Sequence, residues 1–246
     1  MTATITLSCP EGIVMATDKR CTIPKGFDDY DFKDNVNKIF AFSKIPIGIS
    51  CWGLASFNSG TILDFLSKFE SEKIVGNEDV NAVSEKLKTY VESNYSEVEI
   101  GMGFHIAGYC TNGKEKYPQI RHIFHGTWNG AGIFTNEDSN CEYHSLKDGT
   151  KTTFAYDPFI ALFNGERAIA NAFFAYLPKI YPKNTQIALV KLNLKQTIRL
   201  ATIVINTSAE MLDFLYVYDH KIKPKAVAGL MVAQITPNEG FRMIVK

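Results

Sequence analysis

The chain has 246 residues, of which 46% are apolar and 21% charged, a composition typical of a globular protein with a sizeable core. Lysine plus arginine and aspartate plus glutamate number 26 each, so the formal net charge is zero, which disfavours a binder of nucleic acid or of anionic membranes. No apolar run approaches the roughly 20 residues that cross a bilayer, and the N-terminus has no secretory signal pattern.

The chain opens with a predicted β-hairpin. Residues 3–8 alternate threonine or serine with apolar side chains, which is the period-two pattern of a strand. A turn sequence at 10–12 separates them from a second predicted strand over 13–22. The aspartate-rich stretch 23–35 contains a proline and a glycine, and we predict a loop there.

Strands and helices then alternate in groups. Apolar residues at helical spacing after Leu54 predict a first helix that includes 62–69. The remaining predicted elements are strands at 38–42 and 45–51, a helix over 83–91, strands at 102–110, 119–125 and 143–154, helices at 166–177 and 194–211, and a hairpin of 226–236 with 241–245.

This order of elements predicts an α+β fold that forms one domain over residues 1–246. Consecutive hairpins and paired helices suggest two mainly antiparallel sheets packed together, with helix pairs on the outer faces. The expected architecture is therefore a four-layer αββα sandwich.

The cysteines and histidines do not form a metal motif. The five cysteines are scattered without CxxC spacing, and we expect reduced thiols in a cytoplasmic protein. His122 and His125 lie three apart on a predicted strand, so their side chains point to opposite faces. We expect no metal and no cofactor. A serine–histidine or cysteine–histidine hydrolase is an open alternative, although no Gly-x-Ser-x-Gly sequence occurs.

Thr2 is a candidate nucleophile. A small second residue permits removal of the initiator methionine, and we expect this step alone to expose Thr2, without a propeptide. An N-terminal threonine combines a hydroxyl nucleophile with its own α-amine as base. An unperturbed α-amine has a pKa of about 8, so it can accept the hydroxyl proton near neutral pH.

Four stretches within residues 2–70, about a quarter of the chain, support this interpretation: Thr2-Ala3-Thr4-Ile5, Ala16-Thr17-Asp18-Lys19-Arg20, Asn37-Lys38-Ile39 and Ser50-Cys51-Trp52-Gly53. They resemble the start of proteasome-type β subunits, which are N-terminal-nucleophile hydrolases of αββα architecture. The simpler bacterial proteasome-like proteins are the most similar in style.

The resemblance implies a catalytic group of Thr2, Asp18 and Lys38, with Asp18 sixteen residues after Thr2. Asp18 would keep Lys38 charged and oriented, and the ammonium of Lys38 would disfavour protonation of the α-amine. The backbone N–H of Gly53, just before the first long helix, would form the oxyanion hole. The alternative is that Asp18 and Lys38 form an ordinary ion pair near the surface, which stabilises little.

Further residues receive supporting roles. Arg20 is expected to brace this region, and Cys21 and Cys51 are expected near the pocket for the residue before the cleaved bond. At the start of the third helix the family has a serine that helps to hold the N-terminal amine, and Asn164 stands in its place as a hydrogen-bonding substitute. The family's aspartate before the last hairpin is absent from the sequence Gly229-Leu230-Met231-Val232.

The predicted function is a threonine-type endopeptidase that acts through an acyl-enzyme ester on peptides or unfolded proteins. The resemblance implies a homo-oligomer, as a ring or a related assembly, and an ATP-dependent unfoldase as partner. Two alternatives stay open. One is a catalytically silent structural subunit of such an assembly, suggested by the missing serine and aspartate. The other is an N-terminal-nucleophile amidohydrolase or transferase for small amides.

Overall fold

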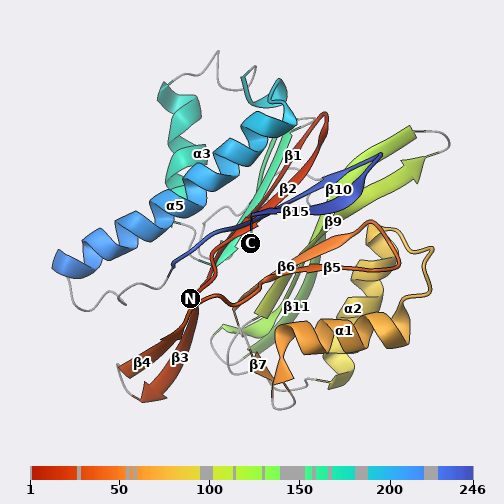
Figure 1. The fold of residues 1–246 in the computed structure, drawn as a ribbon, viewed down its shortest axis with the longest axis horizontal. Coiled ribbons are helices and arrows are strands. Elements are labelled where there is room, and N and C mark those ends of the chain that lie inside the picture. The colour runs from red at the N-terminus through yellow and green to blue at the C-terminus, as the bar shows by residue number, and fades with distance from the viewer. Residues whose placement is uncertain are drawn as a thin grey trace.

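The computed structural model describes residues 2–26, 29–53, 56–57, 60–94, 102–112, 115–128, 131–138, 153–156, 159–165, 168–180, 188–218 and 227–245. These include two antiparallel sheets, two short ribbons and four long helices (Figure 1). The helices are α1 (Ile62–Lys73), α2 (Val80–Asn94), α3 (Ala168–Ile180) and α5 (Leu194–Tyr218).

The larger sheet has the opening hairpin near its centre. Its strands lie in the order β12 (Thr153–Tyr156), β13 (Phe159–Gly165), β1 (Ala3–Cys9), β2 (Gly12–Thr17), β14 (Met231–Thr236) and β15 (Gly240–Val245). Strand β1 is buried on both faces. Its apolar side chains, such as Ile5 and Leu7, pack in a cluster with side chains of α3 and α5, which leaves the threonines for the opposite face.

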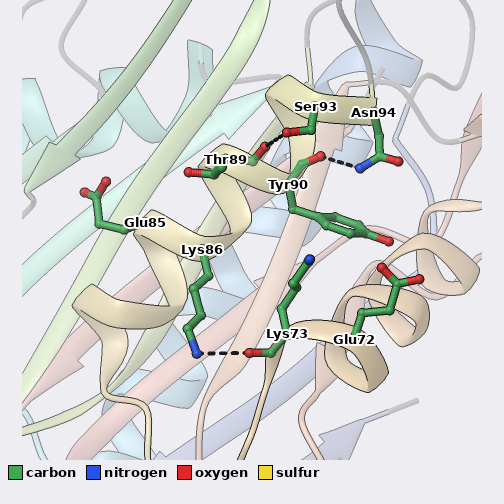
Figure 2. A pocket seen from close by; sticks show the side chains of 8 residues that line it. All are labelled: Glu72, Lys73, Glu85, Lys86, Thr89, Tyr90, Ser93 and Asn94. Carbon is green, nitrogen blue, oxygen red and sulfur yellow. Dashed lines mark hydrogen bonds between the residues drawn. The ribbon is translucent and has the colours of Figure 1, made fainter.

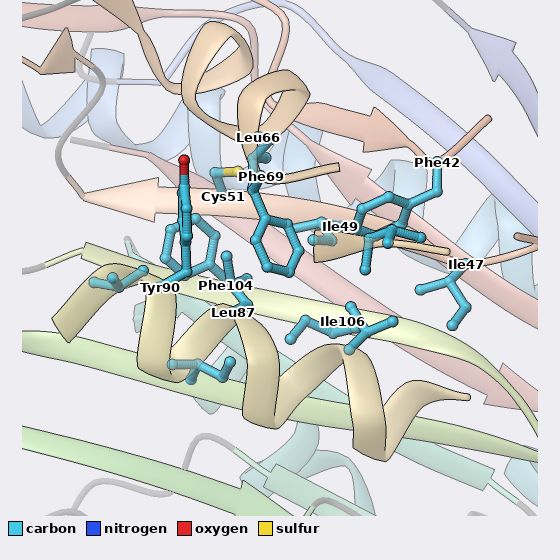
Figure 3. Packing of buried hydrophobic residues seen from close by; sticks show 14 of the residues in the cluster. Phe42, Ile47, Ile49, Cys51, Leu66, Phe69, Leu87, Tyr90, Phe104 and Ile106 are labelled. Atoms are coloured by element: carbon cyan, nitrogen blue, oxygen red, sulfur yellow. The ribbon is translucent and has the colours of Figure 1, made fainter. Parts of the chain in front are cut away.

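The second sheet carries the other half of the core. Its strands lie in the order β11 (Ala131–Asp138), β10 (Glu115–Trp128), β9 (Met102–Asn112), β6 (Gly48–Gly53) and β5 (Ile39–Ala41). Figure 3 shows side chains of this sheet packed against α1 and α2, with Phe69, Leu87 and Phe104 fully buried in the cluster. Burial of each such side chain stabilises the fold by about 1.5–3 kcal/mol.

The inner faces of the two sheets meet in a mixed layer. A third cluster of apolar side chains, including Met15, Ala107 and Leu162, comes from strands of both sheets. Polar contacts lie in the same layer: the Thr4 hydroxyl donates to Ser50 Oγ at 3.1 Å, and Thr6 Oγ1 lies 3.0 Å from His105 Nδ1. The threonines of β1 therefore face the second sheet.

The expected four-layer αββα sandwich flanked by helix pairs is wrong. The structure is α+β with two antiparallel sheets, as predicted, but it is richer in sheet than such a sandwich. The helices also do not cover the sheets in equal pairs. The backbone of α2 lies across β9, β10 and β11, and that of α5 lies on β1, β2 and β14. The backbone of α1 lies nearest to α2 and the β7–β8 ribbon, and that of α3 nearest to α5.

Several boundaries also differ from the prediction. The expected loop at 23–35 contains a ribbon of β3 (Cys21–Gly26) and β4 (Asp29–Lys33), and a second ribbon of β7 (Ser56–Phe57) and β8 (Gly60–Thr61) precedes α1. Most of the predicted strand at 143–154 lies outside the described residues. Only its end is described, and this end belongs to β12. Helix α5 is confirmed and extends beyond the predicted end. The stabilisation from burying its apolar face outweighs the low helix propensity of its many β-branched residues.

Within the described residues, none of the helices combines the length and the apolar character that a transmembrane span requires.

Candidate active site

Thr2, Asp18 and Lys38 meet in the structure. Lys38 Nζ donates to Thr2 Oγ1 at 3.0 Å and to Asp18 Oδ1 at 2.8 Å, and also to the carbonyl oxygen of Arg20. All three side chains are buried, with exposed fractions of 5% for Thr2, 0% for Asp18 and 3% for Lys38. The expected surface location of this ion pair is therefore wrong, because the pair lies inside the protein. The alternative that it is only an ordinary ion pair stays open.

The β1–β2 hairpin positions Thr2 and Asp18. Thr4 pairs with Thr17 across the hairpin, so that the chain leaving β2 lies beside the residues that enter β1. The backbone N–H of Asp18 donates to the Ala3 carbonyl at 3.1 Å, and the Ala3 N–H donates to Asp18 Oδ1 at 2.9 Å. The Asp18 carboxylate thus ties the two strands together directly beside Thr2.

Lys38 comes from the other sheet. It precedes β5, and its carbonyl oxygen accepts from the backbone N–H of Cys51 at 2.9 Å. Its side chain therefore crosses from the edge of the second sheet to the start of β1. The cluster forms only when the two sheets pack together.

Burial shifts the titration of both charged groups. It raises the pKa of the Asp18 carboxyl above its usual range, although attraction to Lys38 acts in the opposite direction. It lowers the pKa of the Lys38 ammonium, although Asp18 acts to raise it. Low polarity penalises each charged form, so Lys38 releases a proton more readily than an exposed lysine. A lysine of this kind can take part in proton transfer near a hydroxyl.

Gly53 is not placed as predicted. It is the last residue of β6, paired with Met102, and it has a φ of 85°. Helix α1 begins only at Ile62, with the β7–β8 ribbon in between. The dipole of α1 therefore does not strengthen the Gly53 N–H as a hydrogen-bond donor. An oxyanion hole at Gly53 would depend on this backbone N–H alone.

Arg20 braces the segment that follows Asp18. Its guanidinium contacts Asp34 through two hydrogen bonds of 2.5 and 2.7 Å and lies 5.1 Å from the ring centre of Phe32. Its backbone N–H donates to Asp18 Oδ2 at 2.9 Å. Arg20 thereby links the base of the β3–β4 ribbon to the buried carboxylate.

Cys21 and Cys51 lie at the start of β3 and within β6. Cys21 is partly exposed and Cys51 is buried, and burial raises the pKa of the Cys51 thiol far above its usual range. Lys38 contacts the backbone of Cys51 and that of Arg20, which directly precedes Cys21, so both cysteines lie near it. Their role in a substrate pocket stays a prediction.

The carboxamide of Asn164 faces a histidine. Its Oδ1 lies 2.7 Å from His105 Nε2, and His105 Nδ1 in turn contacts Thr6. Its predicted role as a partner of the N-terminal amine stays untested. His105 was not predicted from the sequence. The run of threonines on one face of β1, a strand with two buried faces, was a signal for polar partners across the sheets.

Gly165 lies against the backbone of Thr2. It has a φ of 77°, and a Cβ at this position would lie 1.8 Å from the Thr2 carbonyl oxygen. We expect Gly165→Ala to displace Thr2 and to lower the free energy of unfolding by about 2–4 kcal/mol, since conformational strain and a backbone clash combine.

Gly76→Ala is the matched control for this change. Gly76 also has a positive φ, 111°, but its added Cβ would meet only Lys44 atoms at 3.9 Å. Strain alone should cost about 1–2 kcal/mol there. Urea unfolding of both variants measures the difference, and equal losses would contradict a backbone contact between Gly165 and Thr2.

The ring of His105 predicts a pH dependence of stability. Burial lowers its pKa to about 3, and His122 acts in the same direction, whereas an ordinary histidine has a pKa of 6.5. Between these pH values the unfolded chain binds a proton that the folded chain does not, so stability falls as the pH drops through this range. We expect wild type to lose on the order of 1 kcal/mol more per pH unit than His105→Gln. Parallel stability profiles from pH 7 to pH 4 would contradict this.

A separate hollow of about 470 Å³ lies between α1 and α2 (Figure 2). Its lining residues are Glu72, Lys73, Glu85, Lys86, Thr89, Tyr90, Ser93 and Asn94. Lys86 Nζ is held there by the Lys73 carbonyl oxygen at 3.0 Å and by Glu78 at 2.6 Å. The two lysines and two glutamates on its lining balance in charge, so the hollow does not favour a ligand of either sign.

A scan against protein-family models and a search of the curated proteins found no match to this chain. Among the residues that the structure describes, no three histidine, cysteine, aspartate or glutamate side chains gather as metal ligands.

Proposed function

We propose that the protein is an N-terminal-threonine hydrolase that cleaves peptide bonds. The observation that carries the proposal is the buried contact of Lys38 Nζ with both Thr2 Oγ1 and Asp18 Oδ1, at 3.0 and 2.8 Å. The resemblance of residues 2–70 to proteasome-type β subunits supports the same assignment.

The cost of burying this ion pair favours a functional role. Removing two charges from water costs several kcal/mol, and a well-packed apolar pair is often equally stable or more stable. A buried lysine and carboxylate with shifted pKa values, next to a hydroxyl, form the kind of group that activates a nucleophile. Stability alone gives little reason for such a pair beside Thr2.

The reaction begins once the peptide bond before Thr2 has been cleaved. The free α-amine of Thr2 accepts the proton of Oγ1, and Oγ1 attacks the carbonyl carbon of the substrate. The Lys38 ammonium disfavours the protonated amine and so keeps it available as base, while Asp18 orients Lys38. The Gly53 N–H is our candidate donor to the oxyanion, a contribution of about 2.7–4 kcal/mol where the geometry fits.

The tetrahedral intermediate then collapses. The protonated α-amine gives its proton to the leaving amine of the substrate, the C–N bond breaks, and an ester between Thr2 Oγ1 and the acyl group remains. In the second half, the same amine takes a proton from water, which attacks the ester. The carboxylic acid leaves, and the proton returns to Oγ1.

Turnover of internally quenched peptides, compared with small acyl amides, tests this function. We expect peptide cleavage that stops after treatment with a β-lactone, which acylates N-terminal threonine hydroxyls. Cleavage of small amides alone would instead favour the small-amide hydrolase. A chain that begins at Thr2 and cleaves neither substrate would contradict the proposal and favour the silent structural subunit. Light scattering of the same sample would test the proposed homo-oligomer.

A further inference from the structure

His105 joins the second sheet to two neighbouring strands of the first. It lies on β9 with an exposed fraction of 0%, and both of its ring nitrogens have partners. Nδ1 lies 3.0 Å from Thr6 Oγ1 on β1, and Nε2 lies 2.7 Å from Asn164 Oδ1 on β13. Because a carboxamide oxygen can only accept, Nε2 carries the proton and Nδ1 accepts from the Thr6 hydroxyl.

The Asn164 contact leads directly to Thr2. Asn164 pairs with Thr4 across β13 and β1, and the next residue, Gly165, pairs with Ala3. Gly165 is the residue whose backbone leaves no room for a Cβ beside the Thr2 carbonyl oxygen. Whatever holds Asn164 therefore holds the backbone against which Thr2 rests.

A second set of contacts leads to the candidate oxyanion donor. The His105 ring meets the His122 ring edge-on at 5.5 Å, and His122 stacks on Trp52 at 5.7 Å. The Trp52 ring is also stacked on Phe124 at 5.2 Å and lies so close to Gly103 that a Cβ there would fall 2.2 Å from the ring. Trp52 directly precedes Gly53 in β6, so the position of Gly53 depends on this stack.

We propose that His105 is a positioning residue for Thr2, an inference that rests on the proposed function. Through Asn164 and Gly165 it fixes the backbone beside Thr2, and through His122 and Trp52 it supports the strand that ends at Gly53. It acts on the reaction only through these neighbours, and so it is not itself a catalytic residue. A displacement of about 1 Å in a reacting group can cost about 100-fold in rate, so loss of this support should lower kcat.

Two substitutions separate the Asn164 contact from simple packing. The glutamine amide in His105→Gln reaches the position of Nε2 and can still donate to Asn164. The shorter side chain in His105→Asn reaches only the position of Nδ1, so it keeps a partner for Thr6 and loses Asn164. We expect His105→Asn to lower kcat at least about tenfold with KM within about twofold, and His105→Gln to restore most of kcat.

Hydrogen exchange of the peptide 159–165 gives a readout that needs no activity. We expect faster exchange in His105→Asn than in wild type, and little change in His105→Gln. The proposal would be overturned if all three proteins had the same kcat and the same exchange. It would also be overturned if kcat fell equally in both variants, in proportion to their loss of thermal stability. If wild type neither cleaves peptides nor reacts with a β-lactone, the proposed function fails. The exchange of 159–165 then still decides whether His105 positions this backbone.

Discussion

Thr2→Ala is expected to abolish peptide cleavage, with a fall in kcat of at least about 10³-fold, because it removes the attacking oxygen. Thr2→Ser should keep measurable turnover, since it retains both the hydroxyl and the α-amine. The fold should survive, because Lys38 keeps its contacts with Asp18 and the Arg20 carbonyl oxygen. Loss of one hydrogen bond should cost about 1 kcal/mol. Steady-state peptide cleavage and urea unfolding measure both effects.

Thr4→Ala is the matched control. Thr4 lies on β1 two residues after Thr2 and is also buried, but its hydroxyl donates to Ser50 at 3.1 Å. We expect a similar loss of stability and a kcat within a few-fold of wild type. If Thr2→Ala cleaved peptides at a rate close to that of Thr4→Ala, Thr2 would not be the nucleophile.

Lys38→Met is expected to combine a large loss of activity with a large loss of stability. The change leaves the Asp18 carboxylate buried without its cation, which typically costs about 3–5 kcal/mol. It also removes the charge that keeps the α-amine unprotonated, so kcat should fall about 10²–10⁴-fold. Adding Asp18→Asn to this variant should recover part of the stability, because the uncompensated charge is gone, but should not recover activity.

Lys25→Met provides the control for an exposed pair. Lys25 and Asp31 on the β3–β4 ribbon form an ion pair of 2.7 Å, almost the length of the Lys38–Asp18 pair, but both side chains are more than half exposed. Breaking it should change stability by less than about 1 kcal/mol. Chemical unfolding of Lys38→Met and Lys25→Met measures the loss in free energy of unfolding for each variant. Similar losses in the two variants would contradict our account.

The geometry around Thr2 and Asp18 was largely predictable from the sequence. A short hairpin fixes the register of its strands, so the spacing from Thr2 to Asp18 determines that the two residues end at the same edge. The catalytic roles of Asp18 and Lys38 came only from the family resemblance, and the Lys38 contact depends on the packing of two sheets.

The β3–β4 ribbon was missed for a physical reason. Its proline, glycine and aspartates favour turns locally, but Arg20 contacts Asp34 and Phe32, and Lys25 contacts Asp31. Contacts across the ribbon and at its base thus outweigh the local preference for a turn.

The expected αββα sandwich failed in a similar way. Helical periodicity shows that a helix buries one face, but not whether that face meets a sheet, another helix or both. The partners of α1 and α3 were therefore not predictable.

The role of His105 depends on contacts over long separations. It reaches Thr6 across 99 residues and Asn164 across 59 residues. The predicted strand at 102–110 includes His105 but indicates no partner for it. Its cross-strand neighbour His122 became visible only with the register of β9 and β10.

The measurement that tests the central claim most directly is tandem mass spectrometry of the protein after reaction with a β-lactone. Our account predicts one acyl group per chain, carried on an N-terminal peptide that begins at Thr2 and attached to its side-chain oxygen. An adduct on any other residue, or a chain that still carries a residue before Thr2, would contradict it.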